Sequence, residues 1–189
     1  MRMTTIRRPL TALVAVAALL VAGCILSGQF VIVIPFADDI EATDSNVGSL
    51  EINLANVSKT WEEHADDIQN IVDLKFECKV TNNHGDSTAA GEVWISPTSV
   101  GSNPDADDVR SHEGAVLFLS GFELAPGADI SITFKKSADY ITNLESVLDI
   151  IEGGVFHVYG IANNREFNIT ISGIGDRLHG RIMVTFSAG

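Results

Sequence analysis

The chain has 189 residues, with 12 lysines and arginines against 25 aspartates and glutamates, and its formal net charge is −13 at pH 7. This excess of negative charge repels nucleic acid and disfavours functions that depend on binding it. The length suits one domain of ordinary size that can bury a hydrophobic core of its own.

The first 24 residues have the pattern of an export signal. Three arginines precede an apolar run from Leu10 to Val21, which is shorter than the ~20 apolar residues that a membrane-spanning helix needs. The run ends in the sequence VAGC at residues 21–24, which resembles the lipobox of bacterial lipoproteins.

The resemblance to bacterial lipoproteins implies both a location and an anchor. In that family the signal is cut before the cysteine, and acyl chains are attached to its thiol and to the new N-terminus. Residues 1–23 would then be a signal peptide, and Cys24 would carry the covalent lipid that holds the protein at the bacterial cell envelope. Because Ile25 rather than an acidic residue follows Cys24, the resemblance implies the outer membrane in a Gram-negative cell. Each buried CH₂ group contributes ~0.8 kcal/mol, so two or three acyl chains hold firmly.

The mature chain would be more acidic than the precursor and would have one free cysteine. Removal of residues 1–23 leaves 9 basic and 25 acidic residues, a charge of 9 − 25 = −16. This charge repels anionic headgroups and is compatible with calcium or a cationic partner. Lipidation of Cys24 leaves Cys78 without a partner for a disulfide. Cys78 alternates with apolar residues from Leu74 to Val80, which predicts a buried, unreactive thiol on a strand.

The N-terminal part of the mature chain has two alternative assignments. Residues 29–39 predict an apolar strand that ends at Pro35, because proline lacks the backbone donor that a ladder uses. The acidic stretch that follows is either a tether between lipid and domain or a loop within the domain. Residues 24–48 are therefore assigned to the lipidated N-terminus, as a first strand or a tether, and residues 49–189 to a single β-rich domain.

The domain is predicted to consist mainly of strands. Alternating apolar and polar residues predict strands at residues 50–57, 74–80, 92–96, 130–134, 155–162, 166–174 and 178–187. The continuous apolar run 115–122 predicts a central strand that is buried on both faces. Two helices are predicted, one from a Thr60 capping box through Val72 and one from Ser137 to a stop at Gly153.

Two segments share the same order of predicted elements. Residues 50–96 and 130–172 each contain an alternating strand, a capped helix, a second strand, an Asn-Asn loop and a further strand. The similarity is one of architecture rather than sequence identity. An internal duplication and independent use of the same spacing both explain it.

The predicted fold is mainly β, a β-sandwich of about eight strands with two crossover helices. The stretch LAPGADISITF at residues 124–134 resembles the proline–glycine turn and strand of immunoglobulin-like sandwiches, which implies that order of strands. The alternative is a two-layer α+β fold with both helices on one face of a single sheet.

Candidate binding residues lie on one strand and one loop. Trp94 alternates with Val93 and Ile95, so it points away from the core and could mark a surface for an envelope protein or a glycan. The polar segment 97–114 contains Asp105, Asp107 and Asp108, which are the best candidates for a calcium site. Their spacing does not match an EF-hand loop, and an ordinary solvated loop is the alternative.

The sequence predicts a function only in outline. We expect a membrane-anchored envelope lipoprotein that acts as a non-catalytic binding or structural module, with no cofactor besides the lipid on Cys24. The alternative is a calcium-dependent binder or hydrolase that uses the acidic loop 103–113. The expected partners are the membrane and an envelope protein or glycan, and not nucleic acid.

Overall fold

A computed structural model describes residues 29–36, 38–41, 46–163 and 168–188 of the chain. The strands are β1 (Gln29–Phe36), β2 (Asp38–Glu41), β3 (Val47–Asn53), β4 (Ile68–Asn82), β5 (Ala89–Ser96), β6 (Val116–Leu119), β7 (Glu123–Leu124), β8 (Asp129–Ile132), β9 (Val155–Ala162), β10 (Asn168–Ser172) and β11 (Gly180–Ala188). The helices are α2 (Leu54–Val57), α3 (Lys59–His64), α4 (Ala106–Ser111) and α5 (Leu144–Glu152), with 3₁₀ turns η1 (Ala65–Asp67) and η2 (Ser137–Asp139). Over these ranges we find no helix that combines the length and apolar character needed to cross a bilayer.

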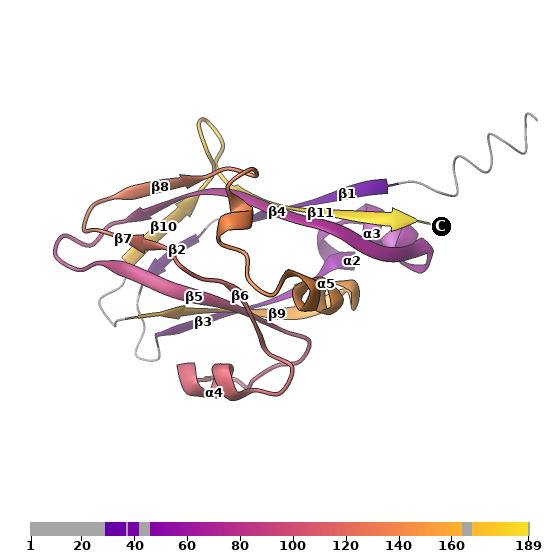
Figure 1. Cartoon of the computed structure of the whole chain (residues 1–189), viewed down its shortest axis with the longest axis horizontal. Coiled ribbons are helices and arrows are strands. Elements are labelled where there is room, and N and C mark those ends of the chain that lie inside the picture. Colours follow the sequence, from indigo (N-terminus) through magenta and orange to yellow (C-terminus); the bar gives the residue numbers. More distant parts are fainter. Residues whose placement is uncertain (1–28, 37, 42–45, 164–167, 189) are drawn as a thin grey trace, which may run out of the picture.

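The strands form two antiparallel sheets that pack face to face (Figure 1). In the first sheet the order is β1-β11-β4-β10-β2, with β8 on the other edge of β4. In the second sheet the order is β3-β9-β5-β6, and β7 also pairs with β5.

Several of these short strands are parts of longer, interrupted ones. β1 pairs with β11 and β2 pairs with β10, while β11 and β10 pair with successive parts of β4. β1 and β2 therefore lie one after the other along the same neighbouring strand, and β10 and β11 form one strand broken by a loop at residues 173–179. β6 and β7 follow one another along β5 in the same way.

Counted in this way, each sheet has the four strands of a jelly roll. The orders are β1/β2–β10/β11–β4–β8 and β3–β9–β5–β6/β7, which in chain order are strands 1-8-3-6 and 2-7-4-5. This is the double Greek-key arrangement of a jelly-roll sandwich. The prediction of a mainly β sandwich of about eight strands is confirmed, but the strand order is not the immunoglobulin order that the turn at 126–127 suggested.

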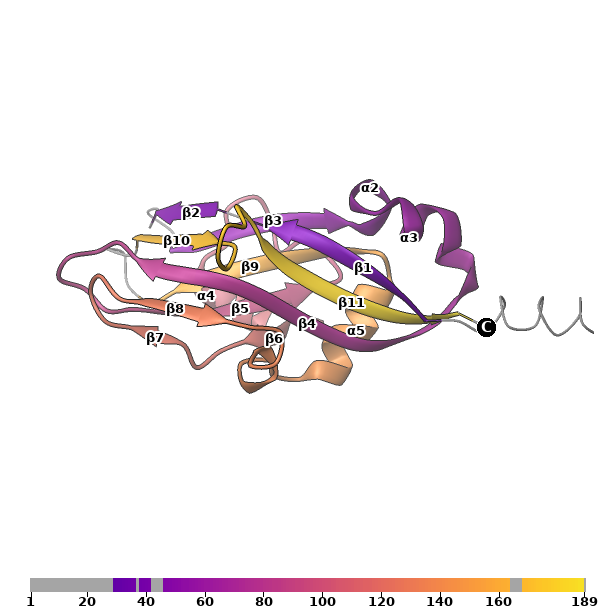
Figure 2. The ribbon, with the colours of Figure 1, turned by 90° about the horizontal axis from the view of Figure 1, so that it is seen from above.

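The helical links connect the two sheets instead of covering one face. The chain leaves β3 through α2 and α3 and enters β4 in the other sheet, and it leaves β8 through η2 and α5 and enters β9. Both links lie toward the end of the sandwich that holds the C-terminus (Figures 1 and 2). The alternative of a single sheet with both helices on one face does not describe this arrangement.

The repeated order of elements matches the symmetry of the jelly roll. β3 pairs with β9 as β8 pairs with β4, and β5 pairs with β9 as β10 pairs with β4. Residues 50–96 and 130–172 thus occupy equivalent places in opposite sheets. An internal duplication and independent use of the same spacing would both give this arrangement.

The core lies between the two sheets. Its larger cluster is closed at the helical end by the Trp61 indole, which meets the Phe186 ring edge-on with centroids 5.2 Å apart. The buried members of this cluster are Ile32, Ile34, Ile52, Leu54, Trp61, Ile71, Leu74, Ile95, Phe118, Val147, Ile151, Phe156, Val184 and Phe186. A smaller cluster at the other end contains Phe76, Cys78, Val80, Ala89, Leu124, Ile132 and Ile169.

Both predicted helices are shorter than expected. The first predicted helix, from Thr60 to Val72, is wrong beyond residue 64, because α3 ends there and the chain from Ile68 belongs to β4. Its N-cap is Ser58, whose hydroxyl accepts a hydrogen bond from the Trp61 amide at 3.3 Å. In the second predicted helix, residues 137–139 form a 3₁₀ turn and the α-helix begins only at Leu144.

Two predicted strands also differ in place. Within the run 115–122, only residues 116–119 form a strand, β6, which lies at the edge of its sheet rather than at its centre. Pro35 does not end β1, because β1 is an edge strand where a missing donor is tolerated. Since β1 and β2 both pair within the sheet, residues 29–36 and 38–41 are part of the jelly roll rather than a free tether.

Candidate functional site

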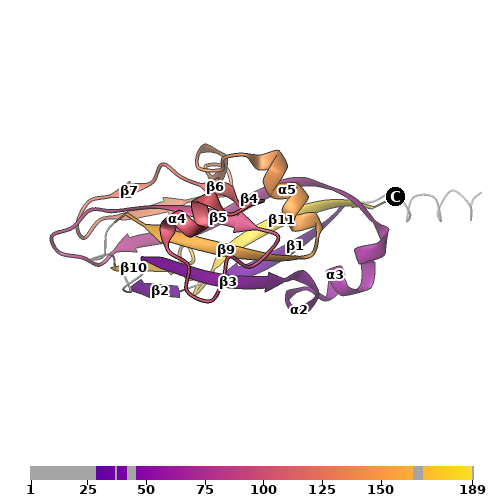
Figure 3. The same cartoon turned by 90° about the horizontal axis from the view of Figure 1, so that it is seen from below.

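The outer face of the second sheet is covered by the segment 97–114, which contains α4. Figure 3 shows α4 over β9 and β5 on the side away from the first sheet. Val109 of α4 is fully buried against Tyr159 and Ile161 of β9. The Tyr159 hydroxyl accepts a hydrogen bond from the amide of Val100 at 2.8 Å, which ties the start of the segment to the sheet.

Trp94 lies at the edge of this covered area. It packs with Val109 on the outer face, whereas Val93 and Ile95 belong to the core between the sheets. The side chain is half-buried, and its indole N–H donates to Glu92 Oε2 at 2.8 Å. Trp94 therefore packs under α4 and holds Glu92 in place, and only part of its ring is exposed to solvent.

Glu92 is held in its ionised form by its neighbours. The Nε of Arg110, on α4, donates to Glu92 Oε2 at 3.1 Å, and its Nη2 donates to Oε1 at 3.3 Å. Partial burial pushes the pKa of Glu92 up, but the hydrogen bonds from Trp94 and Arg110 and the Arg110 charge outweigh it, so this pKa lies below its usual value of 4.5. The carboxylate is therefore a fixed acceptor rather than a source of protons near neutral pH.

Two of the three candidate calcium ligands, Asp105 and Asp108, form the N-terminal cap of α4. Asp105 Oδ1 accepts hydrogen bonds from the amides of Asp107 at 2.9 Å and Asp108 at 2.8 Å, and Asp108 Oδ2 accepts one from the Asp105 amide at 3.0 Å. This reciprocal pair is a capping box. In the part of the chain that the structure describes, no group of three or more histidine, cysteine or acidic residues is placed to hold a metal ion. The geometry thus gives Asp105 and Asp108 a structural role, while the exposed Asp107 side chain lies 3.7 Å from Arg110.

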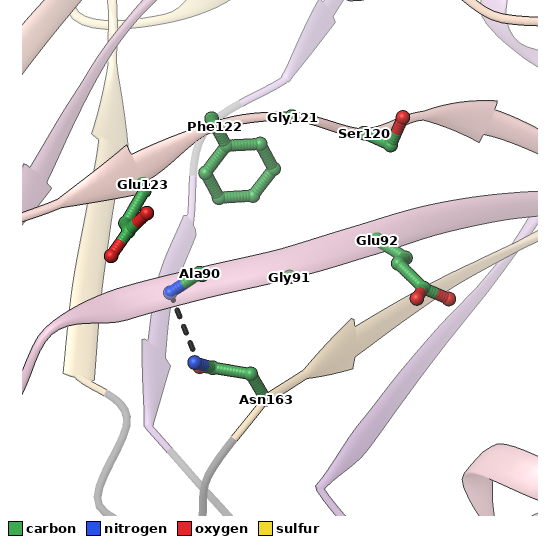
Figure 4. A pocket seen from close by; sticks show the side chains of 8 residues that line it. All are labelled: Ala90, Gly91, Glu92, Ser120, Gly121, Phe122, Glu123 and Asn163. Atoms are coloured by element: carbon green, nitrogen blue, oxygen red, sulfur yellow. Dashed lines mark hydrogen bonds between the residues drawn. The ribbon is translucent and has the colours of Figure 1, made fainter.

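An open depression of about 330 Å³ lies beside Glu92 on the same sheet (Figure 4). It forms where the ladder of β5 is interrupted: Ala90 pairs with Glu123 of β7 and Val93 pairs with Leu119 of β6, but residues 120–122 bow away between them. The lining residues are Ala90, Gly91, Glu92, Ser120, Gly121, Phe122, Glu123 and Asn163.

The chemistry of the depression combines one aromatic ring with several polar groups. Figure 4 shows the two carboxylates of Glu92 and Glu123 on either side of Gly91, with the Phe122 ring on the opposite wall. Asn163 Oδ1 accepts a hydrogen bond from the Ala90 amide at 3.1 Å, which fixes this side chain at the rim. Such a surface suits a ligand that offers hydroxyl or amide hydrogens and one apolar face.

A glycine is required in the floor of the depression. A Cβ atom at position 91 would lie 2.5 Å from the carbonyl oxygen of Ile161 on β9. The close packing of β5 against β9 therefore excludes a larger residue at this position.

Sequence reasoning missed Phe122 and Asn163 as candidate site residues. Asn163 could have been found from the Asn-Asn pairs that open both loops. Its counterpart Asn82 is fully buried and donates to the carbonyl oxygens of Ser87 at 2.8 Å and Leu124 at 3.1 Å. The two asparagines thus have related roles in tying loops to strands.

The two cysteines differ in what the structure says of them. Cys78 is buried in β4, and burial, helped by the neighbouring Glu77 charge, raises the pKa of its thiol to about 12. The prediction of a buried thiol is confirmed. Cys24, the predicted lipidation site, lies outside the described residues.

Comparisons with known proteins identify no relative by sequence: no family model matches the chain, and no curated protein matches it. Among solved structures, the chain is similar to one from Desmodium yellow mottle tymovirus, with a TM-score of 0.33 and 11% identity over 85% of this chain and 89% of that chain. It is also similar to chains from Mud crab tombus-like virus (TM-score 0.33, 11% identity, 86% and 90% covered) and Turnip yellow mosaic virus (TM-score 0.29, 10% identity, 85% and 81% covered). Because these TM-scores are low, the jelly-roll assignment rests on the strand order of this chain alone.

Proposed function

We propose that this chain is a lipid-anchored protein of the bacterial cell envelope and that its jelly roll is a non-catalytic binding module. The lipobox-like sequence at residues 21–24 supports the anchor. The depression on β5 supports the binding role.

The arrangement of the termini suits a protein that stands on a membrane. Gln29 at the start of β1 pairs with Ser187 near the end of β11, so both described ends of the chain meet at one end of the sandwich. At most ~3.5 Å per residue, the link from Cys24 to Gln29 can span no more than about 20 Å. The lipid would therefore hold that end of the sandwich close to the membrane surface.

The depression borders β7, at the part of the sandwich farther from the anchored end. Figures 1 and 2 place β7, which forms one of its walls, toward the end of the sandwich opposite to the C-terminus. A partner in the envelope could reach this surface without meeting the membrane. Ionised Glu92, the Asn163 amide and the Phe122 ring together suit the hydroxyl groups and apolar ring faces of a glycan, or the backbone amides of a protein segment.

Site-specific photo-crosslinking in cells tests this proposal. We would place a photo-reactive amino acid at position 123, on the rim, and at position 145 on α5 as a control, since both glutamates are exposed. We expect one dominant adduct, protein or glycan, from position 123 and its absence from position 145. The same random set of neighbours from both positions would contradict a binding role for the depression.

A further inference from the structure

A cluster of two arginines and one glutamate lies on the outer face of the other sheet. Glu77 of β4 is only 8% exposed, although it carries a charge. Its Oε1 atom accepts hydrogen bonds from Arg177 Nη1 at 3.0 Å and from Arg181 Nε at 2.9 Å, and it also contacts Arg181 Nη2. A single buried carboxylate oxygen thus holds two guanidinium groups side by side.

The surrounding backbone fixes both arginines in place. Arg181 is on β11 directly opposite Glu77, and its guanidinium lies 5.3 Å from the centre of the Phe134 ring. Arg177 lies in the loop 173–179 that interrupts the strand β10/β11. This loop closes tightly, because a Cβ atom at Gly173 would lie 2.5 Å from the carbonyl oxygen of Arg177. The arginines are therefore held in position before any ligand arrives.

This part of the surface concentrates cations in an otherwise acidic protein. Lys75 and Lys79 flank Glu77 on the same face of β4, and they pair with Asp73 and Asp129 respectively. Together with Arg177 and Arg181, these lysines bring four cations to the patch, against the carboxylates of Glu77, Asp73, Asp129 and of Asp176, which precedes Arg177 in the loop. The mature chain as a whole would carry −16.

The guanidinium groups keep unused donors. In the described part of the chain, Glu77 is the only acceptor bonded to either arginine, and it takes three of their N–H groups. The side chains of Arg177 and Arg181 are 54% and 32% exposed, so solvent and ligands can reach the remaining donors. Paired planar guanidinium groups match the oxygen atoms of a phosphate group better than lysines do.

We propose that Arg177 and Arg181, held by Glu77, form a binding site for a phosphate oxyanion. The phosphate can come from the headgroup of an anionic lipid in the membrane that carries the anchor, or from a free phosphate compound. The site itself does not depend on the proposed function, and only the lipid source rests on the lipid anchor at Cys24.

The first experiment measures the melting temperature of the full lipidated protein in a neutral detergent as inorganic phosphate is added, with chloride at matched ionic strength as reference. We expect a saturable rise for the native protein and for the control K59Q, which removes an exposed cation on α3 that pairs with Glu63 at 3.3 Å. R177Q should need about tenfold more phosphate than the native protein for the same rise in melting temperature. We expect the same of R177K, which keeps the positive charge but loses the planar guanidinium. R177Q leaves the pair of Glu77 and Arg181 in place, and R177K serves if R177Q does not fold.

Two outcomes would overturn the site: no phosphate effect on the native protein beyond that of chloride, or the same effect on both Arg177 variants as on the native protein.

The second experiment identifies the source of the phosphate. The lipidated protein is placed in phosphatidylcholine vesicles with or without phosphatidylglycerol, and amide hydrogen exchange is followed over residues 173–181. Slower exchange only with phosphatidylglycerol, and not in R177Q, would support a lipid headgroup as the ligand. Unchanged exchange together with a positive phosphate titration would support a free phosphate compound. If Cys24 proves to carry no lipid, the titration still tests the site, so failure of the anchor and failure of the site are distinguishable.

Discussion

Replacement of Asp105 by alanine separates the two interpretations of the acidic loop. Asp105 caps α4 through two hydrogen bonds of 2.9 and 2.8 Å, and Asp108 completes the capping box. Loss of an aspartate N-cap costs about 1 kcal/mol, within a range of about 0.5–2 kcal/mol. For a domain of this size, that loss corresponds to a fall of about 2–4 °C in melting temperature. The loss should reach the whole domain because α4 carries the fully buried Val109.

Asp107 provides the matched control, because its side chain is 97% exposed and makes only a long contact of 3.7 Å with Arg110. We expect D105A to melt lower than the native protein by the stated amount and D107A to be almost unchanged. Calcium should not raise the melting temperature of the native protein more than magnesium does. The capping account is refuted if D105A and D107A are equally destabilised, or if calcium stabilises the native protein and not D105A.

Three further predictions follow from local geometry. Since its pKa is about 12, the Cys78 thiol should resist alkylation at pH 8 in the folded protein and react only in denaturant; rapid labelling of the native state would contradict its burial. G154A should lower the melting temperature markedly, because Gly154 has φ +78° and a Cβ atom there would lie 2.9 Å from the Trp61 ring. G48A is the control and should have a small effect, since nothing lies within 4 Å of the added Cβ. Because the pKa of Glu92 is depressed in the folded protein, its ionised form stabilises the fold above pH 4.5, and this stabilisation is lost as the pH falls through the folded pKa. The difference in melting temperature between the native protein and E92Q should therefore shrink in acid. A difference that stays constant with pH would refute this stabilising role of Glu92.

The local patterns that could be predicted are those where a strand buries one face. The alternation from Leu74 to Val80 in β4, with Cys78 on the buried face, is visible in the sequence and is confirmed. The turn at Pro126-Gly127 is also confirmed, since Gly127 has φ +68° and the amide of Ala128 donates to the carbonyl oxygen of Ala125 at 3.0 Å.

The errors in the helices have a physical cause. The apolar residues Trp61, Ile68 and Val72 match a helical stripe by spacing, but Ile68 and Val72 lie on a long strand that pairs with β11 or bulges beside it. Pairing along β4 was decided by contacts more than one hundred residues away, which a local pattern does not contain. The same holds for Pro35, whose tolerance depends on the edge position of β1.

The candidate sites depend even more on distant contacts. The depression requires an interrupted ladder between β5 and two other strands, and the arginine cluster requires a loop from residues 173–179 to fold back onto β4. Glu77 and Arg177 look like ordinary surface residues in the sequence. Asp105 shows the reverse case, because an acidic cluster that suggested a metal site is a helix cap.

We propose above that Cys24 carries the lipid that places the jelly roll at the envelope. The most direct measurement is the intact mass of the protein purified from bacterial membranes, together with that of C24A. We predict a native chain that starts at Cys24 and carries the added mass of two or three acyl chains, and a C24A chain that keeps residues 1–23 and gains no acyl mass. A native chain with an unmodified Cys24, or acylation that persists in C24A, would contradict the account.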